Sequence, residues 1–250
     1  MKTLVLVLLC LCVQVTMAQN PINQMFKDMP EGEHKLRYKN GTVRSKWVIK
    51  NGNLDGAYLD YFKNGELRSE TLFKDGKLHG ANYVYDKNGR VKIEEYHRND
   101  TLVYYKEYTY YKSGTVRSKL TLYNHSENYT NLSVHTSDSK PGSLRFDPNK
   151  AFTEGNNSGS YVEYYESGEI RLREILLDRY VQEKSVEYYR NGQVFRDKEY
   201  KDGKQHGASH VYDEKGQLIR VENWENGRKI STSKSDEGTN AQLKPRGNIG

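Results

Sequence analysis

Five basic residues recur at one position of a repeating pattern, three residues after the glycine of an Asn-Gly or Ser-Gly pair. They are Arg44, Arg68, Lys92, Arg117 and Arg171, and two later copies have Phe195 and Ile219 instead. If each copy forms two strands, neighbouring cations lie about 9–10 Å apart, which is twice the strand spacing. Such a column could contact the phosphates or sulfates of an anionic lipid or glycan. We favour ordinary charge alternation, in which Glu70 and Glu94, two residues further on, neutralise the cations.

Tyrosine is the commonest aromatic residue, with 21 copies against 6 Phe and 2 Trp, and it often occurs in adjacent pairs. Because side chains alternate between the faces of a strand, one member of each pair must face away from the core. We expect this outward set to comprise Tyr111, Tyr165 and Tyr189, together with Tyr38 and Phe62. Exposed aromatic side chains can stack on sugars or become buried in a partner, and they can also pack across strands to stiffen a thin sheet. The sequence leaves these alternatives open.

The residue types that usually perform catalysis or bind metals form no recognisable site. His79 and His206 occupy the same place in the repeat, directly before Gly80 and Gly207, which indicates a role in a turn. The other histidines lack metal-ligand spacing, and the carboxylates recur as repeat positions rather than as a facing pair. No nucleotide-binding or serine-hydrolase motif occurs. We therefore expect a non-enzymatic protein without catalytic residues, a metal site or a cofactor.

A repeat with a regular period positions these side chains. The first turn of each copy contains one of seven glycines: Gly41, Gly65, Gly89, Gly114, Gly168, Gly192 and Gly216. The differences between successive glycine numbers are 24, 24, 25, 54, 24 and 24. A second turn follows the first, usually at a glycine such as Gly52 or Gly76, and at Asp100 in the third copy. Short β-branched and aromatic runs closed by such turns indicate β-hairpins.

Two further columns of the repeat predict how the hairpins pack. Two residues after the first glycine, all seven copies have an aliphatic residue, and four residues before it six of the seven have tyrosine. We expect the aliphatic column to face the core. The pattern predicts an all-β fold, an elongated, single-layer, twisted antiparallel sheet of successive β-hairpin repeats. Its two edges leave self-association possible.

The N-terminal segment predicts export. Lys2 precedes an apolar run, and the small residues Thr16 and Ala18 before Gln19 fit a cleavage site. We predict a cleaved signal peptide over residues 1–18, with an uncleaved anchor as the alternative. Both cysteines lie within it, so the mature chain would contain no disulfide. The predicted location is secreted, periplasmic or associated with the cell envelope.

The rest of the chain divides into repeat-containing and irregular parts. Residues 19–35 form an N-terminal lead-in, and the repeats occupy residues 36–124 and 160–230. Residues 125–159 are rich in Asn, Ser and Thr, and we expect a loop-rich interruption or a degraded repeat that replaces at least one unit. The polar tail, residues 231–250, is predicted to be disordered.

The repeat resembles the MORN-repeat variant of bacterial proteins that are often grouped as antitoxin-like. The resemblance rests on a Tyr-x-x-Asn-Gly-x-Leu/Val stretch followed by Lys-Asp-Gly-Lys-x-His-Gly, at residues 61–67 with 74–80 and 188–194 with 201–207. It covers both repeat-containing segments. The resemblance implies a sheet of successive hairpins and a role in protein or lipid contact rather than catalysis.

Composition narrows the class of function. The chain has 250 residues, a formal net charge of +6 and 35% hydrophobic residues, which suits an architecture with no single thick core. The basic residues are not clustered in one domain, so we expect no nucleic-acid partner.

We expect a secreted or envelope-associated scaffold that binds another protein through a long sheet face. The alternative is binding of anionic lipid headgroups or glycans through the Arg/Lys and Tyr columns. The candidate surface comprises Arg44, Arg68, Lys92, Arg117, Arg171, Tyr111, Tyr165 and Tyr189.

Overall fold

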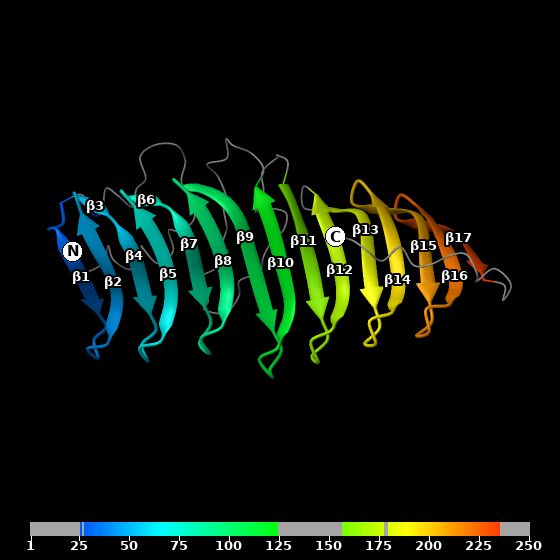
Figure 1. Ribbon diagram of the computed structural model, residues 1–250, viewed down its shortest axis with the longest axis horizontal. Coiled ribbons are helices and arrows are strands. Elements are labelled where there is room, and N and C mark those ends of the chain that lie inside the picture. The colour runs from blue at the N-terminus through cyan, green and yellow to red at the C-terminus, as the bar shows by residue number, and fades with distance from the viewer. Residues whose placement is uncertain (1–25, 27, 125–156, 178–179, 236–250) are drawn as a thin grey trace. The chain divides into compact units, whose positions relative to one another are not determined.

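The computed structural model describes residues 26, 28–124, 157–177 and 180–235 (Figure 1). Its regular structure is 17 β-strands, and every strand pair whose register is described is antiparallel. Successive strands are joined into hairpins that follow the period of the sequence repeat. The expected all-β fold of antiparallel hairpin repeats is confirmed. The chain forms two compact units, residues 1–107 with 123–157 and residues 108–122 with 158–250.

The first unit contains three hairpin repeats. Its strands are β1 (Gly32–Arg37), β2 (Val43–Lys50), β3 (Asn53–Leu54), β4 (Gly56–Tyr61), β5 (Leu67–Lys74), β6 (Lys77–Leu78), β7 (Gly80–Tyr85), β8 (Val91–Arg98) and most of β9 (Thr101–Tyr110). The short strands β3 and β6 pair with the ends of β2 and β5, whose other ends pair with β4 and β7. The sheet therefore begins at Gly32, inside the predicted lead-in.

The second unit continues the pattern. Its strands are the end of β9, most of β10 (Val116–Asn124) and of β11 (Asn157–Tyr164), and all of β12 (Ile170–Leu177), β13 (Tyr180–Tyr188), β14 (Val194–Lys201), β15 (Lys204–Tyr212), β16 (Leu218–Glu225) and β17 (Arg228–Lys234). From β11 onward each strand pairs with the next one in the chain. β17 extends to Lys234, so the first residues of the predicted disordered tail are a strand; residues 236–250 lie outside the described residues.

The long gap in the repeat spacing is a single repeat step with additional residues. β10 and β11 are hydrogen-bonded neighbours in the sheet. The Tyr111 hydroxyl donates to the main-chain oxygen of Tyr164, as the Tyr165 hydroxyl does to Tyr188 one repeat later. The wide spacing between Gly114 and Gly168 is thus an insertion where a second turn would stand, rather than the replacement of a unit. Residues 125–156 themselves lie outside the described residues, and residues 157–159 already belong to β11.

All seven first turns have the same hydrogen-bonded geometry. In the second repeat the Gly65 amide donates to the Phe62 oxygen at 3.0 Å, and the Phe62 amide donates to the Glu66 oxygen at 2.8 Å. The same two bonds recur at each of the other six glycines. The seven glycines have φ between 74° and 105°, which explains why the position excludes residues with a Cβ.

The second turns use two consecutive residues with positive φ. Asn51 and Gly52 have φ of 52° and 73°, and the Asp-Gly and Asn-Gly pairs of later repeats match them. In the third repeat Asn99 and Asp100 have φ of 49° and 68°, so Asp100 adopts the left-handed backbone as expected. His125 and Arg179, which stand in this slot elsewhere, lie outside the described residues.

Each unit presents two faces, which we name by the side chains they carry. On the tyrosine face Tyr61 lies opposite Leu67, and Glu70 lies opposite Tyr83. The other face is the carboxylate face, where in the first unit Asp60 lies opposite Ser45. In the second unit, Tyr188 and Val194 share the tyrosine face, whereas Glu174 and Ser185 share the carboxylate face.

The buried clusters lie on different faces in the two units. In the second unit Val186, Val194 and Tyr212 form a cluster on the tyrosine face, as the column pattern predicts. In the first unit the main cluster lies on the carboxylate face, where Phe26 covers Trp47, Ile49, Leu54 and Phe73. The aliphatic residues of the first unit's column are only half-buried. The expectation that this column faces the main core is therefore wrong for the first unit, because Phe26 covers the other face.

Candidate binding surfaces

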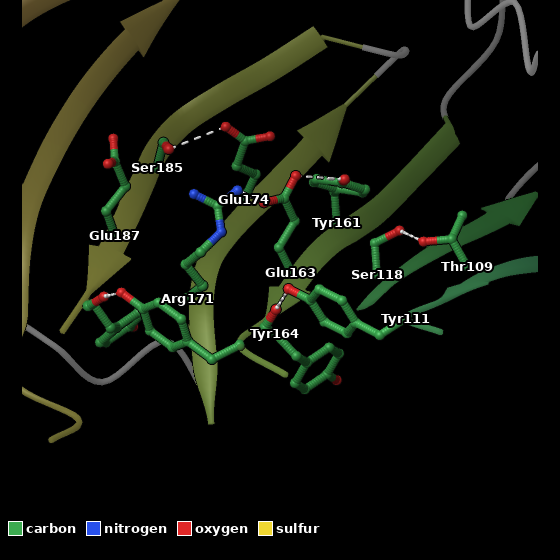
Figure 2. Close-up of polar contacts among 12 residues, drawn as sticks. Thr109, Tyr111, Ser118, Tyr161, Glu163, Tyr164, Arg171, Glu174, Ser185 and Glu187 are labelled. Atoms are coloured by element: carbon green, nitrogen blue, oxygen red, sulfur yellow. Dashed lines mark hydrogen bonds and ion pairs between the residues drawn. The ribbon is translucent and has the colours of Figure 1, made fainter. Parts of the chain in front are cut away.

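The three tyrosines of the predicted surface connect neighbouring repeats. The Tyr111 hydroxyl donates to the main-chain oxygen of Tyr164 at 2.7 Å (Figure 2). The Tyr165 hydroxyl donates to that of Tyr188, also at 2.7 Å. The Tyr189 hydroxyl donates to the oxygen of Tyr212 at 2.9 Å. All three tyrosines are half-buried. Tyr38 makes the same bond to the Tyr61 oxygen, so the hydroxyls of this column serve as links within the sheet.

The rings of these tyrosines also contact other side chains of the chain. The Arg117 guanidinium lies 6.0 Å from the centre of the Tyr111 ring, and Arg190 lies 5.3 Å from that of Tyr165. Tyr189 packs edge-on against Phe195 with 5.1 Å between ring centres. Stacking of a sugar on these rings would compete with contacts that the chain already makes.

The predicted cation column consists of β-bulge residues. In six of the seven hairpins, those whose register is described, the register skips one residue after the first turn, and the skipped residues include Arg44, Arg68, Lys92 and Arg171. The skipped residue is Phe195 in the sixth repeat and Ile219 in the seventh. A bulge residue takes no regular place in strand pairing, which explains why cations, Phe and Ile are all accepted there.

Several of these cations act on the chain's own carboxylates. Arg171 forms an ion pair with Glu163 (Figure 2). Burial raises the pKa of Asp60, and the hydrogen bond from Ser45 with the charges of Arg68 and Arg44 offsets part of that rise. Burial likewise raises the pKa of Glu107, and Lys92 opposes it. The expected partner Glu94 instead binds Lys106 and Tyr104.

A network of polar contacts follows the carboxylate face of the second unit (Figure 2). Glu163 accepts a hydrogen bond from the Tyr161 hydroxyl at 2.7 Å, and Glu174 accepts one from Ser185 at 3.1 Å. Glu187 forms an ion pair with Lys198 at 2.5 Å. Burial raises the pKa of Glu174 despite its bond to Ser185. Glu163, Glu174 and Glu187 are thus each bound by a hydroxyl or a cation of the chain itself.

A second aromatic group lies on the tyrosine face of the first unit. The repeat columns place Tyr83 and Tyr85 on one strand face, but no column predicts that Tyr96 and Tyr123 join them. The rings of Tyr96 and Tyr104 are stacked, with centres 5.7 Å apart and an 18° angle between planes. Tyr83 and Tyr85 lie 6.2 Å apart, and Tyr123 packs edge-on against Tyr104. Only strand register could have found this group, because its members come from β7, β8, β9 and β10.

One carboxylate organises the centre of this group. Glu94 accepts hydrogen bonds from the Tyr104 hydroxyl at 2.9 Å and from Lys106 Nζ at 2.8 Å. The same Nζ lies 4.5 Å from the centre of the Tyr104 ring. Burial, followed by the hydrogen bond and charge of Glu94, raises the pKa of Tyr104 to about 12. Tyr104 therefore stays protonated and serves as a hydrogen-bond donor rather than a base.

The histidines of the repeat turns occupy structural positions. Gly80 and Gly207, which follow His79 and His206, have φ of 108° and 94° and bend the returning strand. His79 Nδ1 lies 3.2 Å from Asn99 Oδ1 in the neighbouring turn. Across the described ranges, no group of three His, Cys, Asp or Glu side chains is placed to hold a metal ion.

Comparison with known families supports the resemblance seen in the sequence. Residues 54–75, which span the end of β3 and all of β4 and β5, match the family model described as the MORN repeat variant. The recognition of this repeat is confirmed. No curated protein sequence matches the chain.

Two solved structures show distant likenesses to this chain. A chain of the Glycosylation Associate Protein (Gap123) complex from Streptococcus agalactiae is 19% identical, with a TM-score of 0.24, and the match covers 43% of this chain and 22% of that one. A chain of the TcdB2-TccC3-Cdc42 structure is 9% identical with a TM-score of 0.15, covering 78% and 12%. This chain thus spans less than a quarter of either. Within the residues that the structure describes, no helix has the length and apolar character needed to cross a bilayer.

Proposed function

We propose that this chain, which carries the MORN repeat variant, is a secreted or envelope-associated scaffold that binds another protein through a sheet face. The observation that supports it best is the tyrosine group on the first unit's tyrosine face. Tyrosine gives large contact area at little cost in conformational entropy, and it is enriched where proteins bind each other. Tyr96 stacks on the ring of Tyr104, and Lys106 Nζ lies 4.5 Å from the centre of the same ring, so contacts within the chain already use ring faces that a sugar would need.

The alternative partners, anionic lipids or glycans, draw less support. Arg171 is paired with Glu163, and Arg44 and Arg117 lie over the rings of Tyr38 and Tyr111. A ligand that used these cations would have to replace contacts already made. A non-enzymatic role agrees with carboxylates that are bound to groups of their own face.

Photo-crosslinking from two equally exposed positions tests the protein partner. Tyr123, beside Tyr104, and Ile219, in the second unit, are both 44% exposed. We expect a photoreactive amino acid at position 123 to crosslink one protein from the native envelope or secreted fraction, and the same label at position 219 to crosslink much less. Equal labelling from both positions, or labelling of lipid alone, would contradict the proposal.

Export is tested separately. N-terminal sequencing of the protein recovered outside the cytoplasm should begin at Gln19. A chain that keeps residues 1–18 and stays with the membrane would support the uncleaved anchor instead.

A further inference from the structure

On the tyrosine face of the first unit, the chain's own side chains form a cation site around Lys106. Lys106 Nζ lies 2.8 Å from Glu94 and 4.5 Å from the centre of the Tyr104 ring. Lys106, on β9, is the cross-strand partner of Glu94, on β8. This face can therefore bind a cation between a carboxylate and an aromatic ring.

Glu70, on β5, occupies the position in the second repeat that Glu94 occupies in the third. The cross-strand partner of Glu70 on β7 is Tyr83, whereas the equivalent partner of Glu94 on β9 is Lys106. The Tyr83 and Tyr85 rings are 6.2 Å apart and tilted by 31°. All three side chains are half-buried, and within the described residues no basic group forms an ion pair with Glu70.

We propose that Glu70, Tyr83 and Tyr85 bind the ammonium or guanidinium group of a basic segment on a partner protein. The inference rests on the proposed function and gives its partner a chemistry. Tyr83 lies opposite both Glu70 and Glu94, and of these two carboxylates the chain pairs Glu94 with its own lysine. A partner's lysine or arginine would supply the missing charge while packing on the tyrosine rings. Burial, then the charge of Glu70, raises the pKa of Tyr85, which agrees with a carboxylate close to that hydroxyl.

The chemistry is tested with a fluorescently labelled Gly-Arg-Gly-Arg-Gly peptide and its citrulline counterpart, which has the same shape without the charge. In low salt we expect the arginine peptide to bind the full-length protein about fivefold or more tightly than the citrulline peptide, as measured by anisotropy. Glu70→Gln should abolish that difference. Glu66→Gln, an exposed carboxylate in the first turn, should leave it unchanged. Equal binding of the two peptides, or an unchanged preference in Glu70→Gln, would overturn the proposal.

A further variant places the chain's own cation in the proposed site. Tyr83→Lys puts a lysine opposite Glu70, as Lys106 stands opposite Glu94, and should block the arginine peptide. Unchanged binding of the peptide to this variant would count against the equivalence of the two positions.

The two proposals fail in different ways. If crosslinking finds a protein partner but the peptide shows no Glu70 dependence, this inference fails alone. If the peptide binds through Glu70 but no protein is crosslinked, the proposed scaffold role fails.

Discussion

At the scale of the residue, a tyrosine hydroxyl adds a side-chain link between one repeat and the next at four positions. Tyr38, Tyr111, Tyr165 and Tyr189 each donate to a main-chain oxygen of the following repeat. In the second repeat the position is Phe62, which has no hydroxyl, and in the third it is Asp86, which accepts hydrogen bonds from Asn88 and Arg90 instead. The strength of the link therefore varies along the chain with the residue at one position.

Tyr165→Phe should lower the stability of the second unit. The variant keeps the ring and leaves the Tyr188 oxygen without its 2.7 Å hydrogen bond, at a cost of about 1 kcal/mol. Urea denaturation followed by circular dichroism measures the change. Phe62→Tyr is the converse variant: a new bond to the oxygen of Tyr85, the equivalent acceptor in the following repeat, should raise the midpoint. A Tyr165→Phe midpoint equal to wild type would show that the bond contributes no net stability.

The pair Asp197 and His210 should make the second unit's stability depend on pH. Asp197 Oδ1 lies 2.7 Å from His210 Nδ1, and this hydrogen bond, opposed by burial, raises the pKa of His210. Burial alone would raise the pKa of Asp197, but the hydrogen bond and charge of His210 outweigh it and hold that pKa below its usual value.

The directions of the two pKa shifts determine how stability changes with pH. The His210 contribution is complete below the unfolded histidine pKa of 6.5 and is lost as pH rises through the higher folded value. The Asp197 contribution is complete above its unfolded pKa of 3.8 and is lost as pH falls through the lower folded value. Urea midpoints from pH 3 to 9 should therefore fall on both sides of a maximum near pH 4–6.5, and His210→Gln should flatten the alkaline side. An identical profile in that variant would assign the dependence to other groups.

At the scale of the element, the hairpin is set by two different turns and one bulge. The first turn needs one residue with positive φ and the second needs two in succession, so their sequence requirements differ. The returning strand bends again at glycines such as Gly56 and Gly80, which also have positive φ. These bends divide the returning strand of the first two repeats into β3 with β4 and β6 with β7.

Alanine substitutions at Gly80 and Gly89 should separate backbone strain from packing. Both glycines have positive φ, at 108° and 74°, so each change should cost about 1–2 kcal/mol. A Cβ at Gly80 would also lie 3.0 Å from Leu72 Cδ1, whereas one at Gly89 would meet nothing within 4 Å. Thermal unfolding should therefore show the larger loss for Gly80→Ala. Equal losses would mean that Leu72 shifts at no measurable cost.

At the scale of the whole molecule, the array is built from local pairings, each between a strand and its immediate neighbours. Such an architecture tolerates changes in length between strands as long as the strands still meet. The insertion between β10 and β11 is the largest such change, and the Tyr111 hydroxyl still reaches the Tyr164 oxygen at 2.7 Å.

Deleting residues 126–155 should leave the second unit folded. The deletion restores the ordinary repeat spacing between Gly114 and Gly168, and His125→Gly in the same variant supplies an Asn-Gly pair for the second turn. We expect the far-ultraviolet circular dichroism per residue of a sheet protein and a melting temperature at or above that of wild type. Loss of cooperative unfolding would indicate that the deleted residues are required by the sheet.

The sequence by itself determined the hairpin repeat, its two kinds of turn and the left-handed role of Asp100, because turn chemistry is local. It also predicted the columns that form the buried cluster of the second unit. Only the tertiary structure showed that Phe26 covers the carboxylate face, so that the buried cluster of the first unit lies there. It also showed that the wide spacing between Gly114 and Gly168 is one repeat step. It also decided that Tyr111, Tyr165 and Tyr189 bond to the next repeat and that Lys106 binds Glu94 while Tyr83 stands opposite Glu70. These outcomes depend on the register between strands and on which segment covers a face, and neither is fixed by the period of the repeat.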